Sequence, residues 1–222
     1  MVTGDTRCEP VSVCRLCGNR ALVFLCEDKR RPFYICNSCE LISVPEQYWL
    51  SAADERARYG LHDNSILNDG YVKYLSQMAD AAAVRHRPGM RVLDFGSGED
   101  AVLCRLLNDR SVDCRAYDPL YRRGLPDGGD NGYDIIILCE VIEHVRDIKK
   151  ELELINRLLQ KTGVVYIRTQ IYADSSIFPG WWYAQDPTHI NFFSEKSLRV
   201  TATAIGRRMD TTDSPDIFIV RH

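Results

Sequence analysis

Four cysteines near the N-terminus have the spacing of metal ligands. Cys14 and Cys17 form one C-x-x-C pair, and Cys36 and Cys39 form a second pair after 18 intervening residues. Four thiolates at this spacing can complete a tetrahedron around zinc, with two ligands from each tight turn. Because four cysteines leave no coordination position open, we expect structural Zn2+, with a catalytic metal or a redox pair as the alternatives.

A second group of residues with chemical potential surrounds two glycines. An apolar run ends in Asp94-Phe95 and is followed by Gly96-Ser97-Gly98 and a helical pattern. This order is typical of the strand, tight turn and helix that open a doubly wound sheet. About twenty residues further on, another short strand ends in Asp118, where a carboxylate can accept hydrogen bonds from a ribose diol. Together the two features predict a nucleoside-containing cofactor.

The acidity of the turn favours one class of cofactor over another. The glycines and Ala101 also fit the loose dinucleotide fingerprint, so NAD is the alternative. However, Asp94, Glu99 and Asp100 lie where a pyrophosphate needs bare N–H groups and a positive helix dipole. A cofactor with a cationic end and no phosphate suits these acids better, and S-adenosylmethionine, which is a sulfonium, has this chemistry.

The chain here resembles the class I S-adenosylmethionine-dependent methyltransferases. The run Asp94–Gly98 matches their first motif, Asp118 matches the ribose acid, and residues 140–145 (EVIEHV) match the segment after their fourth strand. Many members have a third glycine where this chain has Asp100. The resemblance implies an α/β fold with a Rossmann-like, doubly wound sheet of seven strands, the last of them antiparallel, and it implies a methyltransferase.

The expected cofactor contacts come from three places along the chain. They are the glycine turn and ribose acid, the end of the fourth strand, and a lid formed by the segment before the first strand. An aromatic lid residue could attract the sulfonium by a cation–π contact, and ordinary loop residues are the alternative for the lid. The residues are Asp94, Phe95, Gly96, Ser97, Gly98, Asp118, Pro119, Cys139, Glu140, Val141, Tyr59, His62 and Tyr71. We expect Glu143 and His144 to cap the following helix, with catalysis as the alternative.

The aperiodic segment 178–194 carries the candidate catalytic residues. It mixes Trp, Tyr and Phe with Asp, His and Asn, which predicts a loop that walls a pocket, with a loop core as the alternative. His189 is the candidate general base, oriented by Asp186 or Asn191, and Tyr183 is a second polar contact. The alternative for His189 is a structural hydrogen bond to the backbone.

These residues divide the chain into three predicted units. They are a zinc ribbon at 1–46, a linker and lid helix at 47–90, and a methyltransferase domain at 91–222. Strands are expected at 21–26 and 32–36 in the ribbon, and a final hairpin at 208–212 and 216–220. Similar ribbons fused to methyltransferase domains touch RNA, but the basic cluster Lys29-Arg30-Arg31 is offset by nearby acids, so we expect a scaffold.

Composition narrows the functional classes. The chain has 222 residues, 45% of them hydrophobic, with a net charge of −3 and therefore no global basic field for nucleic acid. It shows no membrane-length apolar run and no secretory signal, so a cytoplasmic location is expected. We predict methyl transfer to a small-molecule acceptor with an aromatic or apolar part. The alternatives are an RNA-modifying methyltransferase, and a non-catalytic zinc-ribbon scaffold or NAD-binding protein. The sequence contains no signal for an oligomeric state.

Overall fold

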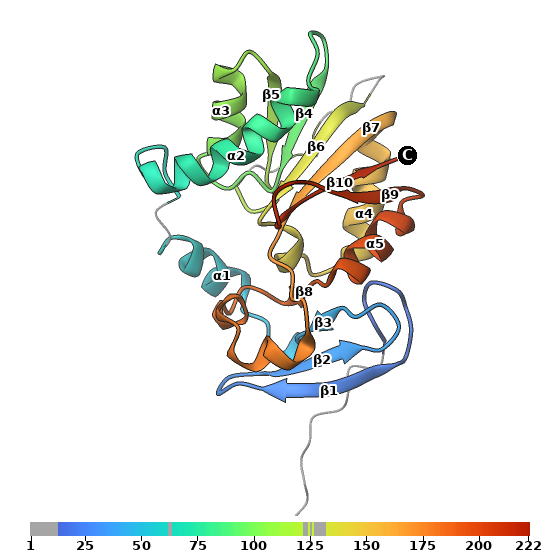
Figure 1. The fold of residues 1–222 in the computed structure, drawn as a ribbon. Helices are drawn as coiled ribbons and strands as arrows, with labels where there is room; N and C mark the ends of the chain where they lie inside the picture. Colours follow the sequence, from blue (N-terminus) through green and yellow to red (C-terminus); the bar gives the residue numbers. More distant parts are fainter. Residues whose placement is uncertain (1–12, 62–63, 122–123, 125, 127–131) are drawn as a thin grey trace, which may run out of the picture.

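Two β-sheets of unequal size organise the molecule. The computed structural model describes residues 13–61, 64–121, 124, 126 and 132–222. Figure 1 shows the larger sheet with its helices in one part of the molecule and the smaller sheet in the other. Among the described helices, none combines the length and the apolar character that crossing a membrane requires.

The larger sheet has the order β5-β4-β6-β7-β10-β9. Its parallel strands are β4 (Arg91–Phe95), β5 (Asp113–Tyr117), β6 (Tyr133–Cys139) and β7 (Leu159–Arg168). Strand β10 (Ile217–Arg221) runs antiparallel between β7 and β9 (Arg208–Thr211), which confirms the predicted hairpin and the antiparallel last strand.

The expectation of seven strands was wrong, because the described residues form six in this sheet. The family's third strand would fall between β5 and β6. The sequence of residues 118–132 has no apolar run longer than Leu120-Tyr121, and its other residues are mainly Gly, Asp, Arg and Pro. A strand buried on both faces of a parallel sheet needs a continuous run of apolar side chains, so this segment lacks the composition for one.

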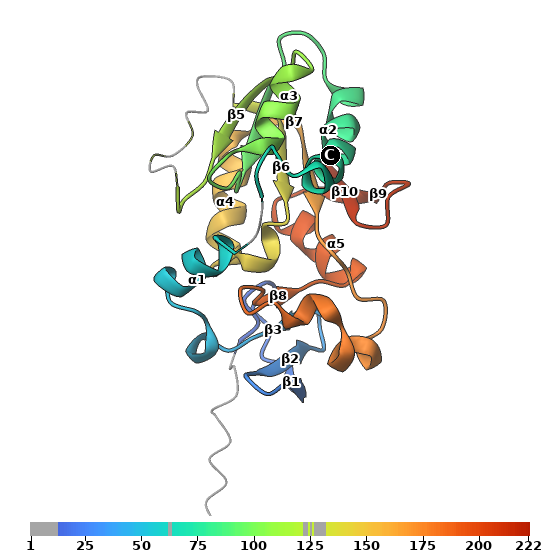
Figure 2. The ribbon, with the colours of Figure 1, turned by 90° about the vertical axis from the view of Figure 1, so that its left-hand side faces the viewer.

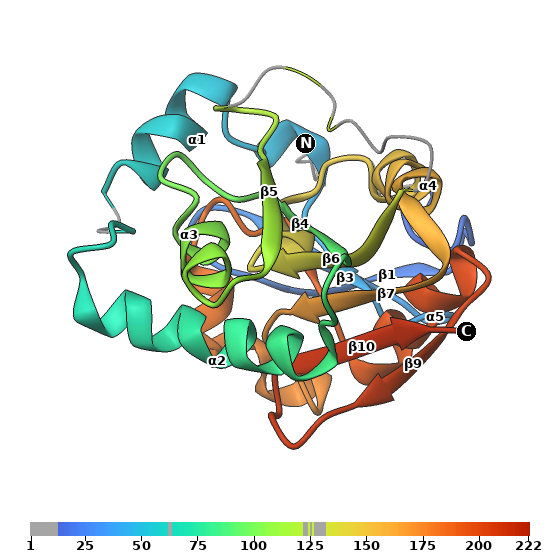
Figure 3. The same cartoon turned by 90° about the horizontal axis from the view of Figure 1, so that it is seen from above.

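Helices cover both faces of the larger sheet (Figure 3). Helices α2 (Asp69–Arg85) and α3 (Val102–Asp109) pack on the face that Ile135 and Ile137 of β6 enter. Helices α4 (Ile148–Leu158) and α5 (Glu195–Ala204) pack on the opposite face, with Ile136 and Leu138. Because successive side chains of a strand point to opposite faces, β6 contributes to both cores.

The smaller sheet combines two segments that are far apart in the sequence. Its antiparallel order is β1 (Leu22–Glu27), β2 (Pro32–Cys36), β3 (Ile42–Ser43) and β8 (Asn191–Phe192). The first two strands confirm the predicted ribbon hairpin, whereas β8 comes from the segment expected to form a pocket loop. The ribbon sheet is thus completed by the C-terminal half, and the boundaries at 46/47 and 90/91 stay predictions.

Helix α1 (Ala52–Tyr59) lies beside the junction between the sheets (Figures 1 and 2). Arg58 pairs with Asp186 at 2.9 Å, and Glu55 pairs with Arg146 at 3.0 Å, so α1 is fastened to both the loop and the main domain. The described residues also form four short 3-10 helices, at Glu46–Tyr48, Ile142–His144, Ser175–Gly180 and Trp182–Gln185.

Candidate functional site

The four predicted metal ligands come together at one end of the smaller sheet. Each of Cys14, Cys17, Cys36 and Cys39 places its sulfur within 4.8 Å of the others, and the closest pairs are 3.5 and 3.6 Å apart. Ligand sulfurs in a zinc tetrahedron are roughly 3.8 Å apart, from a Zn–S distance of about 2.3 Å. The donor set and its spacing therefore fit zinc.

Each pair of cysteines sits on the same kind of tight turn. The N–H of Gly18 donates to the Cys14 carbonyl at 2.8 Å, and the N–H of Glu40 donates to the Cys36 carbonyl at 2.7 Å. Both donors have a left-handed backbone, with φ of 75° and 64°. The contact between the two sulfurs lowers the pKa of the Cys14 thiol and raises the pKa of the Cys39 thiol, because one proton lies between them.

The turn between β4 and α3 has the form expected for a cofactor site. The N–H groups of Gly96 and Ser97 both donate to the Tyr117 carbonyl, at 2.8 and 3.0 Å, and so fasten the turn to β5. A Cβ on Gly96 would meet Val141 at 2.5 Å. Gly98 has a φ of 67°, and a Cβ there would enter open space. The first glycine allows close packing, and the second leaves the face of the turn clear.

Asp118 retains the capacity to bind a hydroxyl. Its two carboxylate oxygens accept from the N–H of Gly98 at 2.9 Å and of Leu120 at 2.8 Å. Each carboxylate oxygen has two lone-pair positions, so further acceptor capacity remains at this buried group. This geometry suits a ribose contact.

Asp94 has a structural role in the turn. Helix α3 begins after Ala101, which has a left-handed φ of 48° and no capping side chain. Asp94 is buried, and its carboxylate accepts from the N–H of Cys104 at 3.2 Å. It therefore satisfies a first-turn donor of the helix and favours its positive end, as an N-cap residue would.

The other expected cofactor residues separate into two places. Tyr71 lies at the cofactor edge, since burial and then the nearby Cys139, Asp94 and Glu140 groups raise its pKa. Phe95 packs against the Tyr117 ring at 5.0 Å, and Pro119 is exposed beside Asp118.

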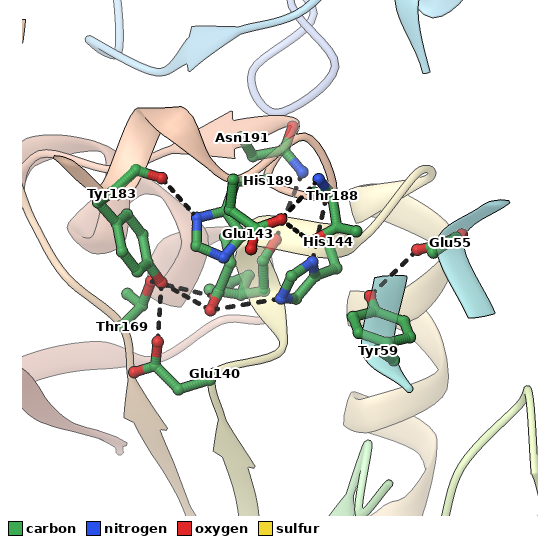
Figure 4. A network of polar contacts seen from close by, with 12 residues as sticks. Glu55, Tyr59, Glu140, Glu143, His144, Thr169, Tyr183, Thr188, His189 and Asn191 are labelled. Atoms are coloured by element: carbon green, nitrogen blue, oxygen red, sulfur yellow. Dashed lines mark hydrogen bonds and ion pairs between the residues drawn. The ribbon is translucent and has the colours of Figure 1, made fainter. Parts of the chain in front are cut away.

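Tyr59 instead lies beside the predicted catalytic residues. Its ring is 5.5 Å from the His144 ring, and its hydroxyl donates to Glu55 at 3.1 Å (Figure 4). The predicted lid residue His62 lies outside the described residues.

A buried polar cluster lies at the carboxyl ends of β6 and β7 (Figure 4). The Tyr183 hydroxyl is 2.6 Å from Glu143, 3.0 Å from Glu140 and 3.2 Å from Thr169. Burial, followed by the charge of Glu143, raises the pKa of Glu140 to about 8. Burial also raises the pKa of Glu143 to about 7, against the opposing hydrogen bonds from Tyr183 and Thr169. Burial thus favours the protonated form of both carboxyls.

Two histidines border this cluster and are held by backbone carbonyls. Nδ1 of His144 lies 3.1 Å from the Thr188 oxygen, and Nδ1 of His189 lies 2.8 Å from the Tyr183 oxygen. Burial lowers the pKa of both imidazoles, that of His189 to about 3. Both rings are therefore neutral near pH 7, and the assignment of His189 as general base stays a prediction.

The expected capping role of Glu143 and His144 was wrong. Helix α4 is capped by Asp147, whose carboxylate accepts from the N–H of Lys150 at 3.1 Å. Glu143 and His144 point instead toward Tyr183 and His189 (Figure 4).

The expected orienting residues bind other groups. Asp186 accepts from the Thr188 hydroxyl at 2.6 Å and from Arg58 at 2.9 Å. Burial acts to raise the pKa of Asp186, but these hydrogen bonds hold it below the usual range. The Asn191 amide donates to the Val145 carbonyl at 2.7 Å and accepts from Arg15 at 3.2 Å. Asp186 and Asn191 therefore hold the loop against helix α1, the segment after β6 and the ribbon.

An arginine of the ribbon holds the loop 184–189, and this contact was not predicted from the sequence. Arg31 is only 3% exposed, and its guanidinium donates to backbone carbonyls at 2.7–3.0 Å. The acceptors belong to Ala184, Asp186, Pro187 and His189. In the sequence this arginine was one member of a short basic cluster, and no local pattern distinguished it from its neighbours.

Most of the loop's aromatic residues form a core rather than a pocket wall. Phe178 and Phe192 are buried, and the ring of Phe33 from the ribbon lies 5.0 and 5.8 Å from theirs. Trp182, in contrast, is 66% exposed. The apolar rings therefore join the loop to the ribbon, which is the alternative the sequence had left open.

Comparisons with known proteins agree with this architecture. A family model described as a methyltransferase domain matches residues 68–211. No curated protein matches the chain.

Solved structures share the fold at low sequence identity. A SAM-dependent methyltransferase from Archaeoglobus fulgidus is 12% identical, over 68% of this chain and 94% of that one, with a TM-score of 0.52. An O-methyltransferase family protein from Burkholderia thailandensis is 14% identical with a TM-score of 0.50, and the match covers 76% of this chain and 60% of that one.

Proposed function

The chain belongs to the methyltransferase domain family, and on this premise we propose that it transfers the methyl group of S-adenosylmethionine to a hydroxyl of a small-molecule acceptor. The observation that carries the proposal is the buried cluster of Glu140, Glu143 and Tyr183. This cluster lies close to the glycine turn, because Val141, the residue after Glu140, packs against Gly96. The cluster thus offers proton acceptors beside the expected methyl group.

The cofactor edge fits S-adenosylmethionine. When bound, this cofactor supplies an electrophilic methyl group on a sulfonium. Asp118 has acceptor capacity for the ribose, Gly98 leaves the face of the turn open, and the acids around the turn favour a cationic group over a pyrophosphate.

Glu140 is suited to receive the proton of the acceptor hydroxyl. Its pKa of about 8 lies near the pH at which such an enzyme works, which is the best range for a general base. Tyr183 connects Glu140 to Glu143, and His189 borders the same space. We assign the acceptor to this space and Tyr183 to its orientation, because a displacement at carbon depends mainly on alignment.

The acceptor is proposed to carry an aromatic or apolar part. Tyr59 and Trp182 support this, since both adjoin the cluster without being buried in a core. The ribbon, proposed as a zinc-stabilised unit over 1–46, supports the acceptor loop through Arg31 rather than contacting RNA.

A labelled-methyl assay tests the proposal. Zinc-loaded protein is incubated with methyl-labelled S-adenosylmethionine and either small aromatic alcohols or total RNA. Label is expected in the small molecules, and Tyr183→Phe should lower the rate about 100-fold while the affinity for S-adenosylhomocysteine is kept. Label in RNA would support the RNA-modifying alternative. Cofactor binding without transfer to either class would support the non-catalytic alternative.

A further inference from the structure

Three side chains beside the acceptor space form a second group of potential metal ligands. One ligand atom from each of Glu143, His144 and His189 lies within 4.8 Å of the other two. The Glu143 side chain is fully buried, and the His144 side chain is 17% exposed. The three come from two distant segments, which are joined by the Ile190 N–H donating to the Glu143 carbonyl at 2.9 Å and by the Asn191 amide donating to the Val145 carbonyl at 2.7 Å.

Both histidines are fixed in the tautomer that metal ligands use. A carbonyl oxygen accepts only from a protonated nitrogen, so the contacts to Thr188 and Tyr183 place the proton of each ring on Nδ1. Nε2 of each neutral ring then has a free lone pair. An N–H held by a backbone carbonyl is also the usual support of a histidine that binds metal through its other nitrogen.

The two free nitrogens face a carboxylate instead of a donor. Nε2 of His144 is 3.8 Å from Glu143, which is longer than a hydrogen bond, and no hydrogen bond to Nε2 of either ring occurs in the described part of the chain. Figure 4 shows both rings beside this carboxylate. The two Nε2 atoms and the Glu143 carboxylate all accept and none donates, so a cation between them would hold all three.

The tyrosine above this space cannot supply the missing positive charge. Tyr183 lies within hydrogen-bond distance of both Glu143 and Glu140 but has one proton for the two. The other donors to these carboxyls are also neutral hydroxyls, from Tyr74 to Glu140 at 2.7 Å and from Thr169 to Glu143 at 3.1 Å. The nearby Arg168 is already paired with Asp216 at 2.8 Å. In the described part of the chain no lysine or arginine pairs with Glu143, so a bound cation would supply the positive partner of this buried carboxyl.

We propose that Glu143, His144 and His189 bind one divalent transition-metal ion. Two imidazole nitrogens and one carboxylate suit Mn2+, Fe2+, Co2+ or Zn2+ better than Mg2+ or Ca2+, which prefer oxygen ligands. Three protein ligands leave coordination positions open, unlike the four-cysteine cluster. This inference rests on the proposed function for one point only, that the open positions take the acceptor hydroxyl.

The ion acts as a Lewis acid in the methyl transfer, without a redox step. Coordination lowers the pKa of the acceptor hydroxyl, and its proton passes to Glu140. The oxygen lone pair forms the new O–C bond, the C–S bond breaks, and its electron pair stays on sulfur. The products are the methyl ether and S-adenosylhomocysteine, and the ion is unchanged.

Titration with Mn2+ alone, followed by electron paramagnetic resonance, tests the site. The full-length chain is loaded with one equivalent of Zn2+, which the four thiolates bind in preference, and is used without cofactor. Mn2+ does not compete for the thiolates, which prefer softer ions, and no further Zn2+ is present to fill the second site. One Mn2+ per chain is expected. Glu143→Gln and His144→Ala should each weaken binding at least about 10-fold. The matched controls Glu153→Gln, on an exposed position of α4, and His86→Ala, after α2, should bind as the wild type does.

The outcomes separate the cation site from the methyl transfer. Wild-type protein that binds no Mn2+, or a folded His144→Ala variant that binds it normally, would overturn the site. His144 is partly exposed, so this variant is decisive even if Glu143→Gln does not fold. S-adenosylhomocysteine affinity is measured on the same samples. Cofactor binding without Mn2+ binding removes the cation site alone, whereas Mn2+ binding without cofactor binding supports the site and removes the proposed function.

Discussion

The cofactor edge and the acceptor edge of the larger sheet are built in different ways. The proposed cofactor edge is centred on one continuous stretch, 94–121, in which backbone groups of the turn bind Tyr117 and Asp118, and Tyr71 and Val141 border it. The acceptor edge combines the end of β6, the loop before β8, helix α1 and the ribbon, which are far apart in sequence. One edge is a local motif, and the other depends on long-range packing.

This difference implies that the two edges can fail separately. Damage to the ribbon should reach the acceptor loop through Arg31 and the β3–β8 pairing, and leave the glycine turn in place. Damage at Asp118 should affect the cofactor alone. The following variants test this separation in order of expected effect.

Cys36→Ser should have the largest effect, because it removes one of four metal ligands. Structural zinc contributes about 10–16 kcal/mol to the folding of small zinc domains, so the ribbon should unfold and β8 should lose its partner strand. We expect loss of stoichiometric zinc, measured by elemental analysis, and loss of transfer, with retained S-adenosylhomocysteine affinity. Cys26→Ser, in β1 but outside the cluster, is the control. Full zinc content in Cys36→Ser would disprove the four-cysteine site.

Arg31→Ala should affect the acceptor edge with the zinc still bound. It removes the charged donor of four loop carbonyls, and hydrogen bonds of this kind contribute about 1.5–3 kcal/mol each. A displaced loop should lower turnover about 100-fold at unchanged cofactor affinity. Arg30→Ala removes an exposed side chain with one loop contact, to Gln185, and is the matched control. Equal losses in both variants would contradict a specific role for Arg31.

Asp118→Ala should affect only the cofactor edge. Loss of the ribose contacts should weaken S-adenosylhomocysteine binding about 10–100-fold, as expected when hydrogen bonds to a charged group are lost. Mn2+ affinity, measured by resonance, should stay at the wild-type value. Asp113→Ala, at an exposed position of β5, the strand that Asp118 follows, is the control. Unchanged cofactor affinity would mean that the ribose lies elsewhere.

Tyr59→Phe should have the smallest effect. It removes the hydrogen bond to Glu55 and keeps the ring against His144. We expect a stability loss of about 0.5–1.5 kcal/mol in thermal unfolding and a change in turnover of less than about twofold. A large loss of turnover would instead give the hydroxyl a direct role at the acceptor edge.

The sequence predicted the local motif better than the assembled site. The two glycines, Asp118 and the cysteine pairs are recognisable because their partners are close in sequence or regularly spaced. Strand β8 has two residues, too few for a period, so its pairing with the ribbon left no pattern.

The loop contacts of Arg31 and the grouping of Glu143, His144 and His189 were not predicted, for the same physical reason. Their contacts join residues more than 40 positions apart, and the side chains themselves are ordinary in their local context. The seven-strand expectation came from the resemblance alone, and the composition between β5 and β6 overrides it.

Calorimetric titration of the zinc-loaded protein tests the central claim most directly, with no acceptor or added divalent ion present. If the cofactor edge is complete in itself, one S-adenosylhomocysteine should bind per chain with micromolar affinity, and NADH should not bind. Binding of NADH would contradict the interpretation of the acidic turn. Absence of S-adenosylhomocysteine binding until an acceptor or ion is added would contradict the independence of the two edges.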